Sequence, residues 1–116
     1  MNEPGTISTG ENSALCIDVE GESYRIEPEE VRGLLFYCRT VPVYQVKRRI
    51  TPDGGVRQNT SIVGHAAIDT SGREVLIFTR AGYYIIPVVS FRKVAGGEDV
   101  SAPLLPFHPD QDDGPT

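Results

Sequence analysis

The sequence has few of the residues, and none of the spacings, from which most metal and catalytic sites are built. Its two cysteines, Cys16 and Cys38, do not form a Cys-x-x-Cys pair, and its two histidines, His65 and His108, complete no metal-ligand pattern with them. The chain also lacks a phosphate-binding loop and a nucleophile and base at motif spacing. We therefore expect no metal, no cofactor and no catalytic residue, so enzymatic activity is an uncertain and disfavoured interpretation.

Long apolar runs are also missing. No stretch approaches the ~18 apolar residues of a membrane-spanning helix, and residues 1–12 lack the basic start and apolar centre of a secretory signal. We expect a soluble, cytoplasmic protein without a membrane span, in which Cys16 and Cys38 are reduced thiols in or near the core. A disulfide between them is the alternative.

An alternating pattern of apolar residues begins near residue 14 and predicts a β-hairpin. Leu15, Ile17 and Val19 share one face, and Glu20–Gly21 provides a tight turn. The returning strand then has Tyr24 opposite Ile17. At 116 residues the chain has the usual length of one domain, so this hairpin is expected to belong to a single core.

Residues 28–38 are predicted to form a short helix. Pro28 suits the first helical position, and Glu29 and Glu30 complement the positive end of the helix dipole. Apolar residues then recur at i, i+3, i+4 and i+7, namely Val31, Leu34, Leu35 and Cys38. We therefore expect Cys38 to face the core.

A strand over residues 43–50 follows the helix, and alternation places Lys47 and Arg49 on one side of it and Arg48 on the other. Residues 51–55, with proline, aspartate and two glycines, form a turn. Residues 56–61 are polar, and they are either the returning strand of a hairpin or a mobile loop.

Four further strands are expected between Ile62 and Val94, over residues 62–69, 74–80, 83–86 and 91–94. The second is apolar on both faces, which predicts a central strand with Leu76 in the core. Gly64, Ala66 and Ala67 are small and require a neighbouring element to approach closely. This is typical of a tightly curved sheet or a closed barrel.

Residues 80–94, with the sequence RAGYYIIPVVSFRKV, are similar in rhythm to the closing hairpin of PRC-barrel and pleckstrin-homology-like modules. In such modules a strand ends at Ile-Pro, turns, and leads into a short last strand. The resemblance covers less than a third of the chain and implies a binding or adaptor role. It carries over no functional residue.

The sequence thus predicts a mostly-β domain (all-β or α+β), a small curved sheet or partly closed barrel of about six or seven short antiparallel strands with one short helix. We expect a mobile N-terminal segment over residues 1–13, the β-rich domain over 14–95, and an acidic, Pro/Gly-rich C-terminal tail over 96–116. Within this tail, residues 100–107 are expected to be extended rather than regular.

Charge is segregated along the chain. Residues 1–42 hold eight acids and three bases, residues 43–95 hold eight bases and three acids, and residues 96–116 hold five acids. The net charge of −5 therefore conceals a basic middle. The candidate anion-binding or partner-binding residues are Lys47, Arg48, Arg49, Arg57, Arg73, Arg80, Arg92 and Lys93.

We interpret the chain as a non-enzymatic protein-interaction or adaptor module, with another protein as the expected partner. The alternative is a small β-barrel that binds nucleic acid or another anionic partner through its basic central strands, although a pI near 4.9 is unlike a dedicated nucleic-acid binder. An enzyme whose site assembles across a dimer is a third hypothesis. The basic residues also fit plain solvated strand faces, and the oligomeric state stays open, with a homodimer among the options.

Overall fold

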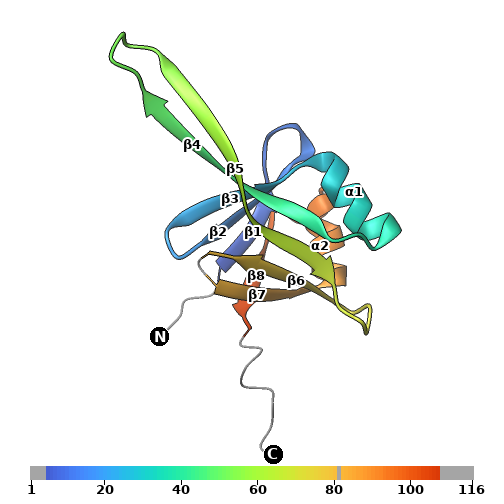
Figure 1. The fold of residues 1–116 in the computed structure, drawn as a ribbon. Coiled ribbons are helices and arrows are strands. Elements are labelled where there is room, and N and C mark those ends of the chain that lie inside the picture. Colours follow the sequence, from blue (N-terminus) through green and yellow to red (C-terminus); the bar gives the residue numbers. More distant parts are fainter. Residues whose placement is uncertain (1–4, 81, 108–116) are drawn as a thin grey trace, which may run out of the picture.

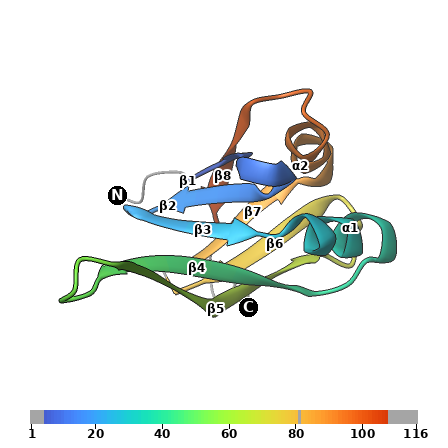
Figure 2. The same cartoon turned by 90° about the horizontal axis from the view of Figure 1, so that it is seen from above.

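The computed structural model describes residues 5–80 and 82–107, and within them eight antiparallel strands close into a barrel in sequence order (Figures 1 and 2). Each strand pairs with the next, and the last pairs with the first. The strands are β1 (Gly5–Thr9), β2 (Leu15–Val19), β3 (Glu22–Ile26), β4 (Val41–Ile50), β5 (Val56–Ile68), β6 (Glu74–Thr79), β7 (Gly82–Pro87) and β8 (Ser101–Pro106).

Two helices lie at one end of the barrel. Helix α1 (Pro28–Tyr37) connects β3 to β4, and helix α2 (Val88–Ala95) connects β7 to β8. Because consecutive strands run in opposite directions, every second connection lies at the same end of the barrel. The end that carries the two helices, which we call the helix end, therefore also carries the 3₁₀ turn η1 (Glu11–Ser13) and the β5–β6 turn. The β4–β5 hairpin leaves from the opposite end (Figures 1 and 2). In the described part of the chain, no helix has the length and apolar character needed to cross a membrane.

The core follows the two-residue period of the strands, as expected for a barrel whose inner face is packed with side chains. The buried strand residues include Ile7, Leu15, Ile17, Val19, Tyr24, Ile26, Val41, Val43, Val75, Ile77, Tyr84, Ile86 and Leu104. Val31 and Leu34 of α1 and Phe91 and Val94 of α2 join the same cluster and close the helix end. At Gly64 a Cβ atom would collide with the carbonyl oxygen of Phe78, so the predicted close approach of a neighbouring strand is confirmed.

The predicted mostly-β barrel is confirmed, with eight strands and two helices where about six or seven strands and one helix were expected. The β2–β3 hairpin has Tyr24 opposite Ile17 as predicted. Residues 56–61 form the returning strand of the β4–β5 hairpin and not a loop.

The predicted domain boundaries differ from the structure at the first and the last strand of the chain. Gly5–Thr9, expected to be mobile, and Ser101–Pro106, expected to lie in the tail, are strands that pair with each other. Their inward residues, Ile7, Ala102 and Leu104, are buried, but they are too few to stand out from polar, proline-spaced surroundings. The expectations for residues 1–4 and 108–116 lie outside the described residues.

Residues 91–94 were predicted to be a strand and instead belong to helix α2. Phe91 and Val94 are both buried, and this spacing of three places them on one face of a helix but on opposite faces of a strand. Val88, also buried, continues the same helical spacing, directly after Pro87. The last strand implied by the resemblance to small barrel modules is therefore replaced by a helix.

Two predicted core positions are also wrong. Cys38 is exposed, because α1 ends at Tyr37 and Cys38 adopts a left-handed conformation with φ of 51° at the helix end. Leu76 is only half-buried on the outer side of β6, while its neighbours Val75 and Ile77 point inward. Leu35, on the predicted apolar face of the helix, and Phe78, in the strand that was expected to be apolar on both faces, are also half-buried.

Candidate functional site

The β4–β5 hairpin extends beyond the barrel as a two-stranded arm, which we define as residues 46–62 (Figure 1). At its base β4 is in register with β3 at Tyr44, and β5 pairs with β6 only from His65 onward. Among the described residues, the two strands of the arm therefore pair only with each other, from Val46 opposite Thr60 to Ile50 opposite Val56. Residues 47–50 and 52–62 are all exposed.

The turn at the tip of the arm is held by local hydrogen bonds. Gly54 supplies a φ of 88°, which a glycine adopts without strain. The Thr51 amide donates to the Gly55 carbonyl at 2.8 Å, and the Asp53 carboxylate accepts hydrogen bonds from the Thr51 hydroxyl and the Gly55 amide. The bond from Thr51, followed by that from Gly55, lowers the pKa of the Asp53 carboxyl. The predicted turn is confirmed.

One face of the arm is basic. Side chains directly opposite in an antiparallel pair share a face, so Arg49 lies beside Arg57 and Lys47 beside Asn59. We call Lys47, Arg49 and Arg57 the basic face. It continues the inner face of the barrel, where Gln45, only 7% exposed, donates a hydrogen bond to the Glu22 carboxylate at 2.8 Å.

The other face of the arm carries an unusual amount of apolar surface for a solvated ribbon. Ile50 and Val56 lie opposite each other at 82% and 65% exposure, and Ile62 lies opposite Tyr44 at the base. We call Val46, Ile50, Val56 and Ile62 the apolar face; Arg48 lies among them, as alternation predicted. Exposed apolar clusters beside charged groups mark protein contact surfaces.

The pairing of Arg49 with Arg57 is unfavourable for the isolated protein. Like charges placed directly across two strands repel each other, and the described residues contain a single salt bridge, between Arg25 and Glu27 at 2.9 Å. No carboxylate in the described part of the chain therefore forms a salt bridge with the basic face. The arrangement favours an external anionic group as its partner.

Replacing Arg57 by glutamate is expected to stabilise the free protein slightly, because it converts a repulsive cross-strand pair into an attractive one. We expect the midpoint of thermal unfolding to rise by about 1 to 3 °C, as small gains at exposed pairs produce in a domain of this size. Circular dichroism measures the midpoint. Arg57→Gln removes only the repulsion, so its midpoint should lie between those of the unmodified protein and Arg57→Glu. A lower midpoint for Arg57→Glu would contradict the pairing.

The structure does not gather all eight predicted basic residues into one surface. Lys47, Arg48, Arg49 and Arg57 lie on the arm. Arg80 lies in the β6–β7 turn at the same end of the barrel, close enough to Tyr24 to oppose the rise in its pKa that burial causes. Arg73, in the β5–β6 turn, and Arg92 and Lys93, on α2, lie at the helix end.

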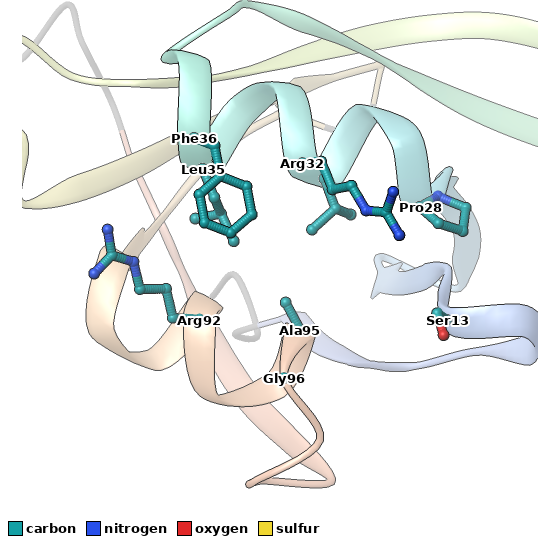
Figure 3. A pocket seen from close by; sticks show the side chains of 9 residues that line it. Ser13, Pro28, Arg32, Leu35, Phe36, Arg92, Ala95 and Gly96 are labelled. Atoms are coloured by element: carbon teal, nitrogen blue, oxygen red, sulfur yellow. The ribbon is translucent and has the colours of Figure 1, made fainter.

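Two surface hollows were not predicted from the sequence. One, of about 540 Å³, lies between α1 and α2, where Leu35 and Phe36 face Arg92 across it (Figure 3). The other, of about 470 Å³, lies between the outer surface of β2 and β3 and the base of the arm. Cys16 lines this second hollow, and burial, with the nearby Asp18 carboxylate, raises the pKa of its thiol. The sequence signal that could have indicated the first is Phe36 itself, a large apolar residue outside the i, i+3, i+4, i+7 pattern of the helix; the structure leaves it 74% exposed.

Within the described residues, the histidine, cysteine and acidic side chains form no metal-binding cluster. His65 is exposed on the outer side of β5, opposite Phe78. Among residues 5–80 and 82–107, no group of three histidine, cysteine, aspartate or glutamate side chains is placed to hold a metal ion. The arm is therefore the most distinctive surface of the molecule. Comparison of the chain with protein-family models, with curated proteins and with solved structures gave no match.

Proposed function

We propose that the protein is a non-enzymatic interaction module that contacts an acidic surface of another protein through the basic face of its arm. The observation that supports this most is the gathering of Lys47, Arg49 and Arg57 on a projecting ribbon. Oppositely charged surfaces steer association and set orientation, and the energetic cost of placing Arg49 beside Arg57 is recovered when carboxylates approach.

The apolar face favours a protein over a nucleic acid as the partner. Protein interfaces combine apolar contacts with charged rims, and Ile50 and Val56 place apolar surface directly behind the basic face. Nucleic-acid interfaces are more polar and much more positively charged, whereas this chain has a net charge of −5. The free thiols of Cys16 and Cys38 support a cytoplasmic location within this proposal.

One observation supports the nucleic-acid alternative. The major groove of DNA admits a two-stranded ribbon, and the arm is such a ribbon, with Gln58 and Asn59 able to donate and accept hydrogen bonds beside the arginines. The experiment below therefore includes a DNA duplex.

A labelled glutamate-rich peptide is expected to bind the protein at low salt, with binding measured by fluorescence anisotropy. Arg49→Glu/Arg57→Glu should weaken the affinity by at least about tenfold, as loss of close charge pairs across an interface does. The matched control, Arg92→Glu/Lys93→Glu, makes the same change in net charge on α2 and should bind nearly as the unmodified protein does. Equal weakening by both variants would contradict the proposal, since binding would then follow net charge alone.

The same titration with a labelled DNA duplex separates the two partner classes. We expect the duplex to bind no more tightly than the peptide. Tighter binding of the duplex, with a steep loss of affinity as salt rises and with sensitivity to the arm variant, would instead select the nucleic-acid alternative.

A further inference from the structure

We infer that the acidic surface contacted by the arm is the β2–β3 end of a second copy of this chain. The inference rests on the proposed function, because it assigns a partner to the same basic face. It joins two surfaces of one molecule that do not satisfy each other within a single copy. The contact would be head to tail, with the arm of one copy on the barrel of the next.

The receiving end consists of Asp18, Glu20 and Glu22, which are all exposed at the β2–β3 turn. By alternation Asp18 lies on the outer face of the hairpin and Glu22 on the inner face, with Glu20 in the turn between them. Two of these carboxylates are oriented by hydrogen bonds. Asp18 accepts from the Ser23 hydroxyl at 2.6 Å, and Glu22 accepts from the buried Gln45 amide at 2.8 Å. Each carboxylate keeps acceptor positions for an incoming guanidinium. Among the described residues, none of the three forms a salt bridge.

Charges of opposite sign form few close pairs within the described part of the molecule. The chain has 16 acidic and 11 basic residues, yet the described part forms one salt bridge. It joins Arg25 on β3 to Glu27, two residues further along the chain. Glu22 lies at the base of the arm through its bond with Gln45, yet among the described residues no carboxylate of the β2–β3 end forms a salt bridge with a cation of the arm. A second copy supplies the opposite charge to each surface.

The charges also determine the kind of contact. Two basic faces repel, so a symmetric contact of arm on arm through Lys47, Arg49 and Arg57 is excluded by electrostatics. A reciprocal contact, with each arm on the acidic end of the other copy, would close a two-fold dimer, whereas the head-to-tail contact inferred here leaves one arm and one acidic end free in every pair. Such heterologous contacts continue into larger assemblies or close into a ring.

Sedimentation velocity over a range of protein concentrations tests the inference. At about 0.05 M salt we expect concentration-dependent growth beyond a dimer, and at about 0.5 M salt, where screening shortens to a few Å, a monomer. The neutral arm variant Arg49→Gln/Arg57→Gln and the neutral end variant Asp18→Asn/Glu20→Gln should each weaken self-association by at least about tenfold. An equimolar mixture of the two should form a 1:1 pair and nothing larger, because only one productive contact remains.

Several results would overturn the inference. A full-length chain that stays monomeric at every concentration and at low salt excludes it, as does a mixture of the two variants that fails to pair. If the chain is monomeric while the arm still binds the glutamate-rich peptide, the partner is a different protein and the proposed function stands. If the arm also fails to bind the peptide, the proposed function fails too.

Folding of the variants is checked by their thermal unfolding midpoints. Should either double variant unfold early, the single variants Arg57→Gln and Glu20→Gln replace them. These change one exposed residue each and must give the same pattern of weakened self-association and 1:1 pairing; its absence would count against the inference.

Discussion

A chain that ends at Gly97 is expected not to fold into a stable barrel. The truncation removes β8, which pairs with both β1 and β7 and closes the sheet. It also removes the buried Leu104 from the core and leaves two strand edges with unpaired backbone groups. Since closure involves every element of a single core, we expect the loss of most of the folding free energy, which is ~5–15 kcal/mol for a typical domain.

The measurement is thermal unfolding followed by near-ultraviolet circular dichroism, with a chain ending at Phe107 as the control that keeps β8. The control should unfold cooperatively at nearly the midpoint of the full chain. A cooperative transition at that same midpoint in the chain ending at Gly97 would contradict barrel closure by β8 and would support the predicted end of the β-rich domain at residue 95.

Replacing Phe91 by alanine is expected to cost about 3–5 kcal/mol, the usual loss for a fully buried aromatic side chain. Phe91 is the largest of the fully buried side chains, and it lies on α2, which packs on β1, β6, β7 and β8 at the helix end. Removal of its ring leaves a cavity that rigid strands cannot fill, and the adjoining Val94 loses contacts as well.

The matched control is Val89→Ala on the same helix, at a position that is 64% exposed. It should change the free energy of unfolding by no more than about 0.5 kcal/mol. Urea denaturation measures both variants. Similar small effects at the two positions would show that α2 is not docked on the barrel as the structure has it.

The features that could be predicted from the sequence are those fixed by neighbours in the chain. The β2–β3 hairpin and α1 follow from alternation, a two-residue turn, and proline and glutamates at a helix start. One strand that depends on distant pairing was missed. Strand β1 has a single large apolar residue, Ile7, and only its partners β2 and β8 make it a strand.

The candidate site was predictable in part for the same reason. Alternation alone placed Lys47 and Arg49 on one side of β4 and Arg48 on the other, as the structure does. The position of Arg57 opposite Arg49 depends on the register across the 51–55 turn. Residues 56–61 left that register open because all of them after Val56 are polar. The separation of Arg73, Arg92 and Lys93 from the arm follows from the alternating direction of the strands, which places the β5–β6 turn and α2 at the end opposite the β4–β5 hairpin.

The most direct test of the arm as the interaction surface is a two-dimensional ¹H–¹⁵N NMR titration of the full chain with the glutamate-rich peptide. At dilute protein and low salt, we predict that the largest shifts fall on amides of residues 46–62, on both strands of the arm, and that added salt reverses them. Amides of α2 around Arg92 and Lys93 should stay in place. Shifts concentrated on α1 and α2, or spread evenly over the basic residues at both ends of the barrel, would contradict the proposed role of the arm.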